Sequence, residues 1–537
     1  MNHQLSGRHL IDGRWVAAAP ADDGAFSSVS PMTGEALAPH FSEATPAEVE
    51  SALSAARKTF VAVHDLDPRW PAALLEAIAA RIESLGDDLL QRGEAETALP
   101  RARLTGERAR TCSQLRMFAE LVREGSWVEA VIDQSDPNRQ PLPKPDIRRM
   151  LRPRGPVVVF GASNFPFAFG TCGGDTASAL AGGNPVIVKG HPSHPGTSEL
   201  FAIAVSMAID ECKLPPGLFA LLQGRQNELS AQLVQHADTQ AVGFTGSLRA
   251  GRALFDLASR REKPIPVYAE MGSLNPVVIL PAAANERAGP IARDLAASLL
   301  LGGGQFCTKP GVVFVVGDPE RRFADALAQH VQSAPAVTML NRNLRDTFAE
   351  RAALISRSNG VIAAVSGKSS GHADQTAVLF ETTAEEFLHN PRLHEEAFGP
   401  GGIVVQCDSS AQAISCVEAL GGNLTGTIHI GKAEDQATVA LVLRSLENIV
   451  GRIIINGYPT GVEVCHAIVH GGPYPATTDS GTTSVGTAAM RRFVRPLAYQ
   501  NTPQEILPPA LQDDNPLGIL RLIDGERTDR RIESPTR

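Results

Sequence analysis

The sequence GPVVVFGASNFPFAFGTCGGDTASALAGGNPVIVKG, residues 155–190, contains two apolar, β-branched runs on either side of a helical pattern. The runs are VVVF (157–160) and PVIVK (185–189), and the helical pattern lies near 174–182. Continuous apolar strands connected by helices are typical of a parallel sheet that is covered on both faces. The stretch therefore predicts an α/β lobe. Further runs of the same kind follow at FALLQ (219–223), AVGFT (241–245) and PVYAE (266–270), with helical patterns between them.

The rest of the chain predicts a second α/β lobe and a helical beginning. Toward the N-terminus, a short strand pair precedes a helix that starts at the capping box Thr45-Pro46-Ala47-Glu48 and runs toward Val63. Helices are expected at about 71–99 and 100–124, and loops from about Gly472 onward. The second lobe is predicted by VVIL (277–280), VVFVV (312–316), GGIVV (401–405) and IIIN (453–456), with a helix near 285–302.

The composition indicates an ordinary globular protein of 537 residues, 43% hydrophobic and 20% charged. The formal net charge is −9 without a dense Lys/Arg run, so we expect neither a nucleic acid nor a membrane as partner. No apolar run reaches the roughly 20 residues of a spanning helix, and residues 1–16 lack the apolar core of a secretory signal. The seven cysteines form no CxxC pair, which argues against a disulfide framework or a structural metal site. We therefore expect a soluble cytoplasmic enzyme without a bound metal.

Three residues are candidates for covalent chemistry on a carbonyl group. Cys307 follows three glycines in GGGQFCTKPG, and a thiolate is both a good nucleophile and a good leaving group from a thioester. Asn164 and Glu270 follow or end apolar runs, and ligands of open α/β sheets bind beyond the carboxyl ends of strands. Asn164 could donate to an oxyanion, and Glu270 could be a general base. Taken singly, an inert buried cysteine, a turn asparagine and a surface glutamate are the commoner interpretations.

Other strand and helix ends carry residues that could bind a phosphorylated cofactor. Lys189 ends the run PVIVK and could reach ribose hydroxyls or a phosphate, although a lysine exposed at the sheet rim is the alternative. Gly246 and Ser247 open a predicted helix, whose N-terminus could receive a phosphate. The usual GxGxxG dinucleotide pattern does not occur in this region. EEAFGP (395–400) is a weak signal by itself.

In this order, the motifs FGASNFP, VIVKG, GFTGS, AEMGSLNP, GGGQFCTKPG and EEAFGP resemble the aldehyde dehydrogenase family, whose dinucleotide sheet also lacks GxGxxG. The resemblance extends from HLIDGRWV to RPLAYQNTP. It implies an α/β fold with a Rossmann-type dinucleotide lobe, an α/β catalytic lobe and a small β arm, in a homodimer or homotetramer. The implied ranges are 1–135 and 155–270 for the dinucleotide lobe, 271–480 for the catalytic lobe, 136–154 and 481–505 for the arm, and 506–537 for a C-terminal tail.

The resemblance also implies roles for individual residues. Cys307 would attack the aldehyde carbon, and Asn164 with the backbone N–H of Cys307 would hold the oxyanion. Hydride would pass to NAD or NADP, and Glu270 would then activate the water that hydrolyses the thioester. Lys189 completes the implied catalytic set. The implied cofactor contacts are Phe160, Lys189, His191, Ser193, Arg225, Gly246, Ser247, Glu396 and Phe398.

The position of Pro192 bears on the choice of cofactor. NAD-preferring members of the family have a glutamate three positions after the lysine that corresponds to Lys189, and here that position is Pro192. Without the carboxylate, a 2′-phosphate meets no like-charge repulsion, and Lys189 or Arg225 could attract it. We expect use of both cofactors, with a preference for NADP.

Three longer stretches resemble one branch of the family, which contains α-ketoglutaric semialdehyde (2,5-dioxovalerate) dehydrogenases and NADP-dependent bacterial fatty-aldehyde dehydrogenases. They are residues 165–200, AEMGSLNP and HGGPYPATTD, with a departure at Gly170-Thr171-Cys172, where Cys172 could alter the substrate entrance. The expected reaction is oxidation of α-ketoglutaric semialdehyde to 2-oxoglutarate. Arg110 could then bind the distal carboxylate, unless it forms a surface or inter-helix salt bridge.

Two alternatives remain open. A medium- or long-chain aliphatic aldehyde would require an apolar tunnel, which Phe165, Phe167, Phe169 and Phe306 could form. A thiol esterase that needs no cofactor is the alternative from another class, because Cys307 and Glu270 could hydrolyse an ester by themselves. A CoA-acylating enzyme is disfavoured, since the hydrolytic base Glu270 is present.

Overall fold

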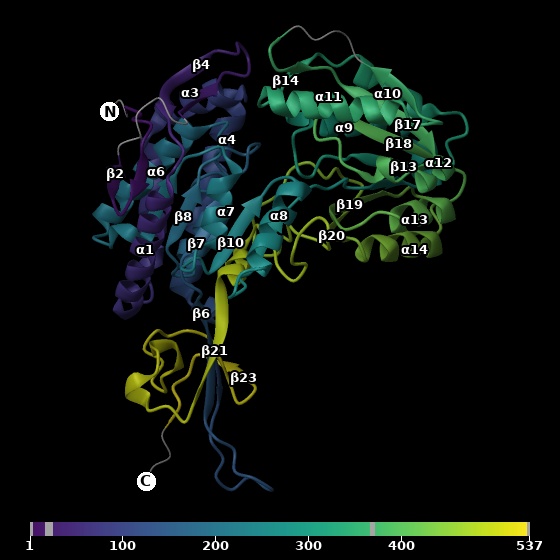
Figure 1. Ribbon diagram of the computed structural model, residues 1–537. Helices are drawn as coiled ribbons and strands as arrows, with labels where there is room; N and C mark the ends of the chain where they lie inside the picture. Colours follow the sequence, from purple (N-terminus) through teal and green to yellow (C-terminus); the bar gives the residue numbers. More distant parts are fainter. Residues whose placement is uncertain (1–3, 17–24, 366–370, 534–537) are drawn as a thin grey trace.

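The computed structural model describes residues 4–16, 25–365 and 371–533. Residues 1–3, 17–24, 366–370 and 534–537, which belong to the ranges expected for the two lobes and the tail, lie outside the described residues. Two lobes lie side by side, and a narrow arm extends away from the first lobe (Figure 1). None of the described helices is long and apolar enough to cross a membrane.

The first lobe is built on the sheet that the apolar runs predict. Its strands follow the order β11-β10-β7-β8-β9-β1-β2, in which β7 to β11 are parallel to one another and β1 is antiparallel to β9. Because β7 pairs with β8 on one side and β10 on the other, the strand order reverses between β7 and β10, which creates a ligand-binding switch point. The bounds are β7 Val157–Phe160, β8 Val186–Lys189, β9 Phe219–Leu222, β10 Ala241–Thr245, β11 Val267–Glu270, and the N-terminal pair β1 His9–Ile11 and β2 Arg14–Val16.

Helices cover both faces of this sheet and bury its apolar side chains, which confirms the predicted α/β class. The capping box forms as predicted, with the Glu48 carboxylate accepting from the Thr45 N–H at 2.7 Å. One face is covered by α1 Pro46–Ala62, α7 Asn227–Gln235 and α8 Leu248–Ser259, and the other by α2 Trp70–Ser84, α3 Gly86–Thr97, α4 Arg101–Glu124, α5 Gly174–Ala181 and α6 Pro195–Glu211.

The second lobe contains another largely parallel sheet, in the order β15-β17-β18-β13-β12-β19-β20, with only β15 antiparallel to its neighbour among the described strands. Its strands are β12 Val277–Ile279, β13 Val312–Val316, β15 Ile362–Val365, β17 Val378–Thr383, β18 Gly401–Cys407, β19 Asn423–His429 and β20 Val450–Ile455. The helices are α9 Pro281–Leu300, α10 Arg322–Gln332, α11 Arg342–Ser356, α12 Ala384–His389, α13 Ser410–Glu418 and α14 Gln436–Glu447. Two small ladders, β3 Phe26–Val29 with β4 Ala36–Phe41 and β14 Val337–Thr338 with β16 Asp374–Gln375, lie apart from both sheets.

The arm differs from the predicted ranges. Its sheet has the order β21-β6-β5-β22-β23, so residues expected to form a separate tail pair with residues expected in the first lobe. The reason is a small apolar core in which Leu511 and Ile519 of the C-terminal segment pack with Ile132. The predicted arm also starts too early, because Ser484 lies in the first lobe against Glu270. The arm strands are β5 Val131–Asp133, β6 Ile147–Pro153, β21 Val494–Gln500, β22 Arg521–Ile523 and β23 Glu526–Thr528.

Candidate active site

A turn of three glycines presents Cys307 between the two lobes. Helix α9 ends at Leu300, and Gly302, Gly303 and Gly304 all have positive φ, between 57° and 68°. A Cβ atom on Gly304 would lie 2.1 Å from the carbonyl oxygen of Gly399, so only glycine fits there. The side-chain amide of Asn275 donates to the carbonyl oxygens of Cys307 at 2.8 Å and Lys309 at 2.9 Å, which fixes the nucleophile loop.

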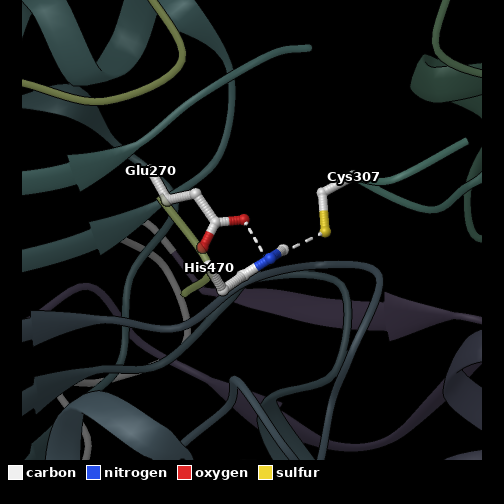
Figure 2. Close-up of side chains that lie close together, drawn as sticks. All are labelled: Glu270, Cys307 and His470. Atoms are coloured by element: carbon white, nitrogen blue, oxygen red, sulfur yellow. Dashed lines mark hydrogen bonds and ion pairs between the residues drawn. The ribbon is translucent and has the colours of Figure 1, made fainter. Parts of the chain in front are cut away.

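Cys307 is in contact with a histidine that is itself paired with Glu270. The Sγ atom lies 3.4 Å from Nε2 of His470, and the same nitrogen lies 2.9 Å from Oε1 of Glu270 (Figure 2). Glu270 ends β11, whereas His470 lies in the loop that follows β20. The second carboxylate oxygen of Glu270 accepts a hydrogen bond from the Ser484 hydroxyl at 2.6 Å. Thiol, imidazole and carboxylate therefore form one polar group, in which His470 and Glu270 are buried and Cys307 is partly exposed.

The electrostatic environment of this group keeps the Cys307 thiol protonated. Burial, followed by the negative charge of Glu270, raises the pKa of Cys307 well above its ordinary value. Burial also tends to raise the pKa of Glu270, but the positive charge that His470 carries when it is protonated, the close contact of its ring, and the hydrogen bond from Ser484 outweigh it and lower the pKa below its ordinary value. The carboxylate is therefore ionised, and the thiol needs a base to become nucleophilic.

Asn164 lies close to the nucleophile loop, as expected from its place after β7. Its side chain is buried, and Nδ2 donates to the carbonyl oxygen of Gln305 at 3.0 Å. An amide nitrogen carries two hydrogens, so a second one remains for an oxyanion. Glu107 of α4 holds the turn that presents Asn164, because its carboxylate accepts from the backbone N–H groups of Phe167 and Ala168 at 2.9 Å each.

A cavity of about 810 Å³ lies beyond the carboxyl end of β8. His191, Pro192, Ser193 and Arg225 line it, which brings together four residues of the predicted cofactor region. The pKa of His191 is lowered well below its ordinary value, first by burial and then by the neighbouring His194 and Lys189, so its ring is neutral. A largely uncharged wall beside two arginines, Arg225 and Arg342, fits the adenosine part of a dinucleotide.

The remaining predicted cofactor residues lie at strand and helix ends. Lys189 is buried at the end of β8, and its ionisable neighbours are Glu43, His191 and His194, not Cys307. Ser247 caps α8 by accepting from the Ala250 N–H at 3.3 Å, directly after Gly246. Phe160 packs edge-on against Phe244 in the core, with ring centroids 6.2 Å apart. Glu396 lies beside Gly272, whose missing Cβ leaves room for the carboxylate, and Phe398 follows in the same loop before β18.

Aromatic rings and two arginines of α4 form the wall beside Cys307. Phe165 packs edge-on against Phe169 and Phe306, with centroids 5.6 and 5.2 Å apart. The Arg103 guanidinium lies 4.9 Å from the Phe165 ring and 4.6 Å from the Phe306 ring, and it donates to the Asn164 carbonyl at 2.7 Å. The Arg110 guanidinium lies 5.8 Å from Phe165 and 5.4 Å from Phe169. The wall is therefore both apolar and cationic.

Comparison with known proteins agrees with this geometry. Residues 15–486 match the profile of the aldehyde dehydrogenase family. The chain belongs to this family. It is 46% identical over 526 residues to alpha-ketoglutaric semialdehyde dehydrogenase 2 of Azospirillum brasilense, covering 97% of this chain and 99% of the relative. It is 43% identical over 527 residues to alpha-ketoglutaric semialdehyde dehydrogenase of Acinetobacter baylyi, with the same coverage. A solved structure of aldehyde dehydrogenase C from Pseudomonas syringae, in complex with NAD+ and octanal, superposes with a TM-score of 0.78 at 19% identity, covering 93% of this chain and 97% of that one.

The chain is thus an NAD(P)-dependent aldehyde dehydrogenase, and two expectations about its pocket are wrong. Cys172 does not border the substrate entrance, because it is buried in the core of the first lobe with its thiol facing the Phe201 carbonyl. Phe167 likewise packs edge-on against Phe201, with centroids 5.3 Å apart, and not with the other phenylalanines near Cys307. In the turn after Asn164, the rings of Phe165 and Phe169 therefore lie beside the pocket, and the ring of Phe167 lies in the core.

Three residues that lie at the reactive centre of the aldehyde dehydrogenase had no role predicted from the sequence. His470 and Ser484 lie in irregular segments without apolar periodicity; His470 begins the branch motif HGGPYPATTD, which could have pointed to it, whereas no quoted motif contains Ser484. Backbone hydrogen bonds carry this region beside β11, for example from the Met271 N–H to the Ala476 carbonyl at 2.7 Å. Arg103 could have been found, because residues 103, 107 and 110 have the spacing of one helix face.

Proposed function

We propose that this aldehyde dehydrogenase oxidises α-ketoglutaric semialdehyde to 2-oxoglutarate. The observation that carries the proposal is the Arg110 guanidinium on the wall beside Cys307. Its Nε and Nη2 atoms are buried without a hydrogen-bond partner in the described part of the chain. A buried charge without partners is costly, and a bound carboxylate would remove the cost by accepting from two donors. The relatives with 43–46% identity carry the name of the same activity.

The position of Arg110 suits a substrate with a carboxylate at one end and an aldehyde at the other. Burial lowers the pKa of Arg110, and the carboxylate of Glu107 opposes this effect. No ion pair joins Glu107 to Arg110 in the described residues: one Glu107 oxygen accepts from two backbone N–H groups, and the other lies 3.9 Å from Nε of Arg103. The charges of Cys307 and Glu270 also act on Arg110, so the arginine lies within electrostatic reach of the reacting thiol.

The side chains divide the reaction steps among them. His470, in contact with both partners, takes the Cys307 proton, and Glu270 stabilises the imidazolium that forms. The thiolate attacks the aldehyde carbon, and the free N–H of Asn164 donates to the oxyanion. A nicotinamide dinucleotide held in the cavity near His191 and Arg225 would supply the hydride acceptor for this carbon. Water then attacks the thioester, and the pair of His470 and Glu270 removes its proton.

Substrate specificity tests the proposal. We expect Arg110→Met to lower kcat/KM for α-ketoglutaric semialdehyde at least about 100-fold, because the carboxylate loses a bidentate, buried partner. The same variant keeps most of its kcat/KM for hexanal and decanal, which also controls for any change in the thiol. Arg110→Lys retains the positive charge but not the planar guanidinium that binds a carboxylate through two N–H groups, so its kcat/KM for the semialdehyde should lie between those of Arg110→Met and the wild type. Equal losses for all aldehydes would reject Arg110 as the carboxylate site, and a wild-type preference for decanal would favour a fatty-aldehyde dehydrogenase.

For the cofactor we propose use of both NAD and NADP with a preference for NADP. The cavity near His191 fits a dinucleotide, and it presents Pro192 and the Arg225 side chain where a carboxylate would repel a 2′-phosphate. Lys189 adds a second cation at the end of β8. Comparison of kcat/KM for the two cofactors tests this preference, and Pro192→Glu should shift the ratio toward NAD.

We further propose that the arm joins subunits into a homodimer or homotetramer. Strand β21 is an edge strand of the arm sheet in the described chain, and such an edge offers unpaired backbone groups to a second strand. Removal of hydrogen-bonding capacity at this edge, for example by Ala498→Pro, should reduce the mass measured by light scattering. An unchanged mass would reject this edge as the subunit contact.

A further inference from the structure

The three side chains of the reactive centre also form a complete ligand set for a transition metal. We propose that Zn²⁺ binds reversibly to Cys307 Sγ, His470 Nε2 and a carboxylate oxygen of Glu270, and that it blocks the enzyme. These ligand atoms all lie within 4.8 Å of one another, and the His470 ring lies between the Glu270 carboxylate and the Cys307 sulfur (Figure 2). Thiolate, imidazole and carboxylate are the ligands that zinc takes in proteins.

The spacing of the ligand atoms is close to that of a tetrahedral zinc site. Zinc bonds of about 2.3 Å to sulfur and about 2.0–2.1 Å to nitrogen or oxygen imply tetrahedral edges of about 3.5 Å between S and N and about 3.3 Å between N and O. The observed edges are 3.4 Å from Sγ to Nε2 and 2.9 Å from Nε2 to Oε1. The third edge, between Sγ and a Glu270 oxygen, is no longer than 4.8 Å, so a movement of the carboxylate toward the sulfur would close the triangle around the ion.

A second observation points to a missing partner at the same place. The Oε1 atom of Glu270 is buried and has no hydrogen bond of good geometry, although the His470 ring nitrogen lies close to it. A metal ion would satisfy this oxygen and the lone pair of His470 together. Thiolate and carboxylate neutralise the charge of the ion, whereas the nearby cations Arg103 and Arg110 oppose its binding. The site therefore favours a strongly bonding borderline or soft ion over Mg²⁺, which prefers oxygen ligands alone.

Binding of the ion explains the expected inhibition without any redox step. The Cys307 thiol loses its proton to solvent, a Zn–S bond forms, and the sulfur lone pair is no longer free for the aldehyde carbon. Partial exposure of Cys307 leaves a path for the ion and a fourth position for water. The inference uses the residues of the proposed function but depends only on their geometry, so it does not depend on which aldehyde is oxidised.

The test follows the metal directly, with the full-length protein freed of metal by dialysis against a chelator. Co²⁺ is the spectroscopic probe, because a cobalt–thiolate bond gives a near-ultraviolet charge-transfer band. We expect one Co²⁺ per chain, displacement by Zn²⁺ but not by Mg²⁺, and protection of Cys307 from iodoacetamide by Zn²⁺. Cys307→Ser should abolish the band, and His470→Asn and Glu270→Gln should each weaken binding by more than about tenfold.

Cys465 and His466 provide a matched control. They lie in the same loop as His470, but neither belongs to the ligand set, and His466 is exposed. The double variant Cys465→Ser/His466→Asn should keep the cobalt band and its affinity. A band that survives in Cys307→Ser, or that disappears in the double variant, would overturn the proposal, as would free alkylation of Cys307 at saturating Zn²⁺. Circular dichroism and Tm verify that each variant is folded.

Discussion

Substitution of His470 by asparagine separates a base in contact with the nucleophile from a merely structural side chain. In the structure, Nε2 is 3.4 Å from the Cys307 sulfur and 2.9 Å from Glu270, so its loss removes the proton acceptor and the partner of the carboxylate at once. A positioned general base contributes about 10²–10⁴ in rate. Glu270 remains within hydrogen-bonding reach of the thiol and can replace part of the function. We therefore expect the lower end, a loss of about 100-fold in kcat/KM, or about 2.7 kcal/mol.

Two assays distinguish this role from loss of structure. The rate of Cys307 alkylation by iodoacetamide, followed against pH, should need a higher pH in His470→Asn, since the buried thiol has lost its base. Pre-steady-state kinetics should show no burst of reduced cofactor in this variant, whereas Glu270→Gln retains the contact between His470 and the thiol and should keep a burst. His466→Asn, in the same loop, serves as the control. An unchanged alkylation profile, with kcat/KM within about threefold of wild type, would refute the reasoning.

Three further predictions follow from single contacts. Asn275→Ala removes two buried hydrogen bonds from the nucleophile loop, one of them to the Cys307 carbonyl; it should cost roughly 2–4 kcal/mol, seen as a lower Tm, and reduce kcat. Gly304→Ala places a Cβ atom 2.1 Å from the Gly399 carbonyl at φ +66°, so kcat should fall strongly while cofactor affinity stays, and normal activity would contradict the close approach. Burial lowers the pKa of Lys189 to about 8, so its positive charge is lost above that pH; KM for NADP should rise between about pH 7 and about pH 9 more than KM for NAD, and a constant ratio would exclude Lys189 from phosphate binding.

The sheets could be predicted from the sequence because their strands are buried on both faces. VVVF and AVGFT became β7 and β10 with nearly the expected bounds, since continuous apolar runs have few other stable environments. The arm could not be divided correctly by the same reasoning. Strand β22 is three residues long and contains Arg521, which is buried because its guanidinium donates to backbone carbonyls such as those of Gln512 and Arg530. A buried arginine that replaces apolar contacts leaves no hydrophobic pattern to detect.

The residues of the candidate site likewise divide into those that the sequence predicts and those that it does not. Cys307, Glu270 and Asn164 could be chosen because each follows or ends an element whose pattern is readable, and family motifs surround them. His470 is 163 positions from Cys307 in the chain, and Ser484 is 214 positions from Glu270. Their proximity arises from loop paths that depend on many individual hydrogen bonds. Such contacts are decided by the tertiary structure, and neither composition nor spacing carries them.

The charges around Cys307 imply that binding of the substrate carboxylate makes the thiol depend more strongly on His470. The positive charge of Arg110 lowers the pKa of Cys307, against the larger effects of burial and Glu270, which raise it. A substrate carboxylate bound to Arg110 would neutralise this effect and raise the pKa of the thiol further. The nucleophilicity of a thiolate rises less steeply with its basicity than the thiolate fraction falls, so the transfer of the thiol proton to His470 becomes more important. Hexanal has no carboxylate and cannot produce this effect, so His470→Asn should lose more kcat/KM with α-ketoglutaric semialdehyde than with hexanal.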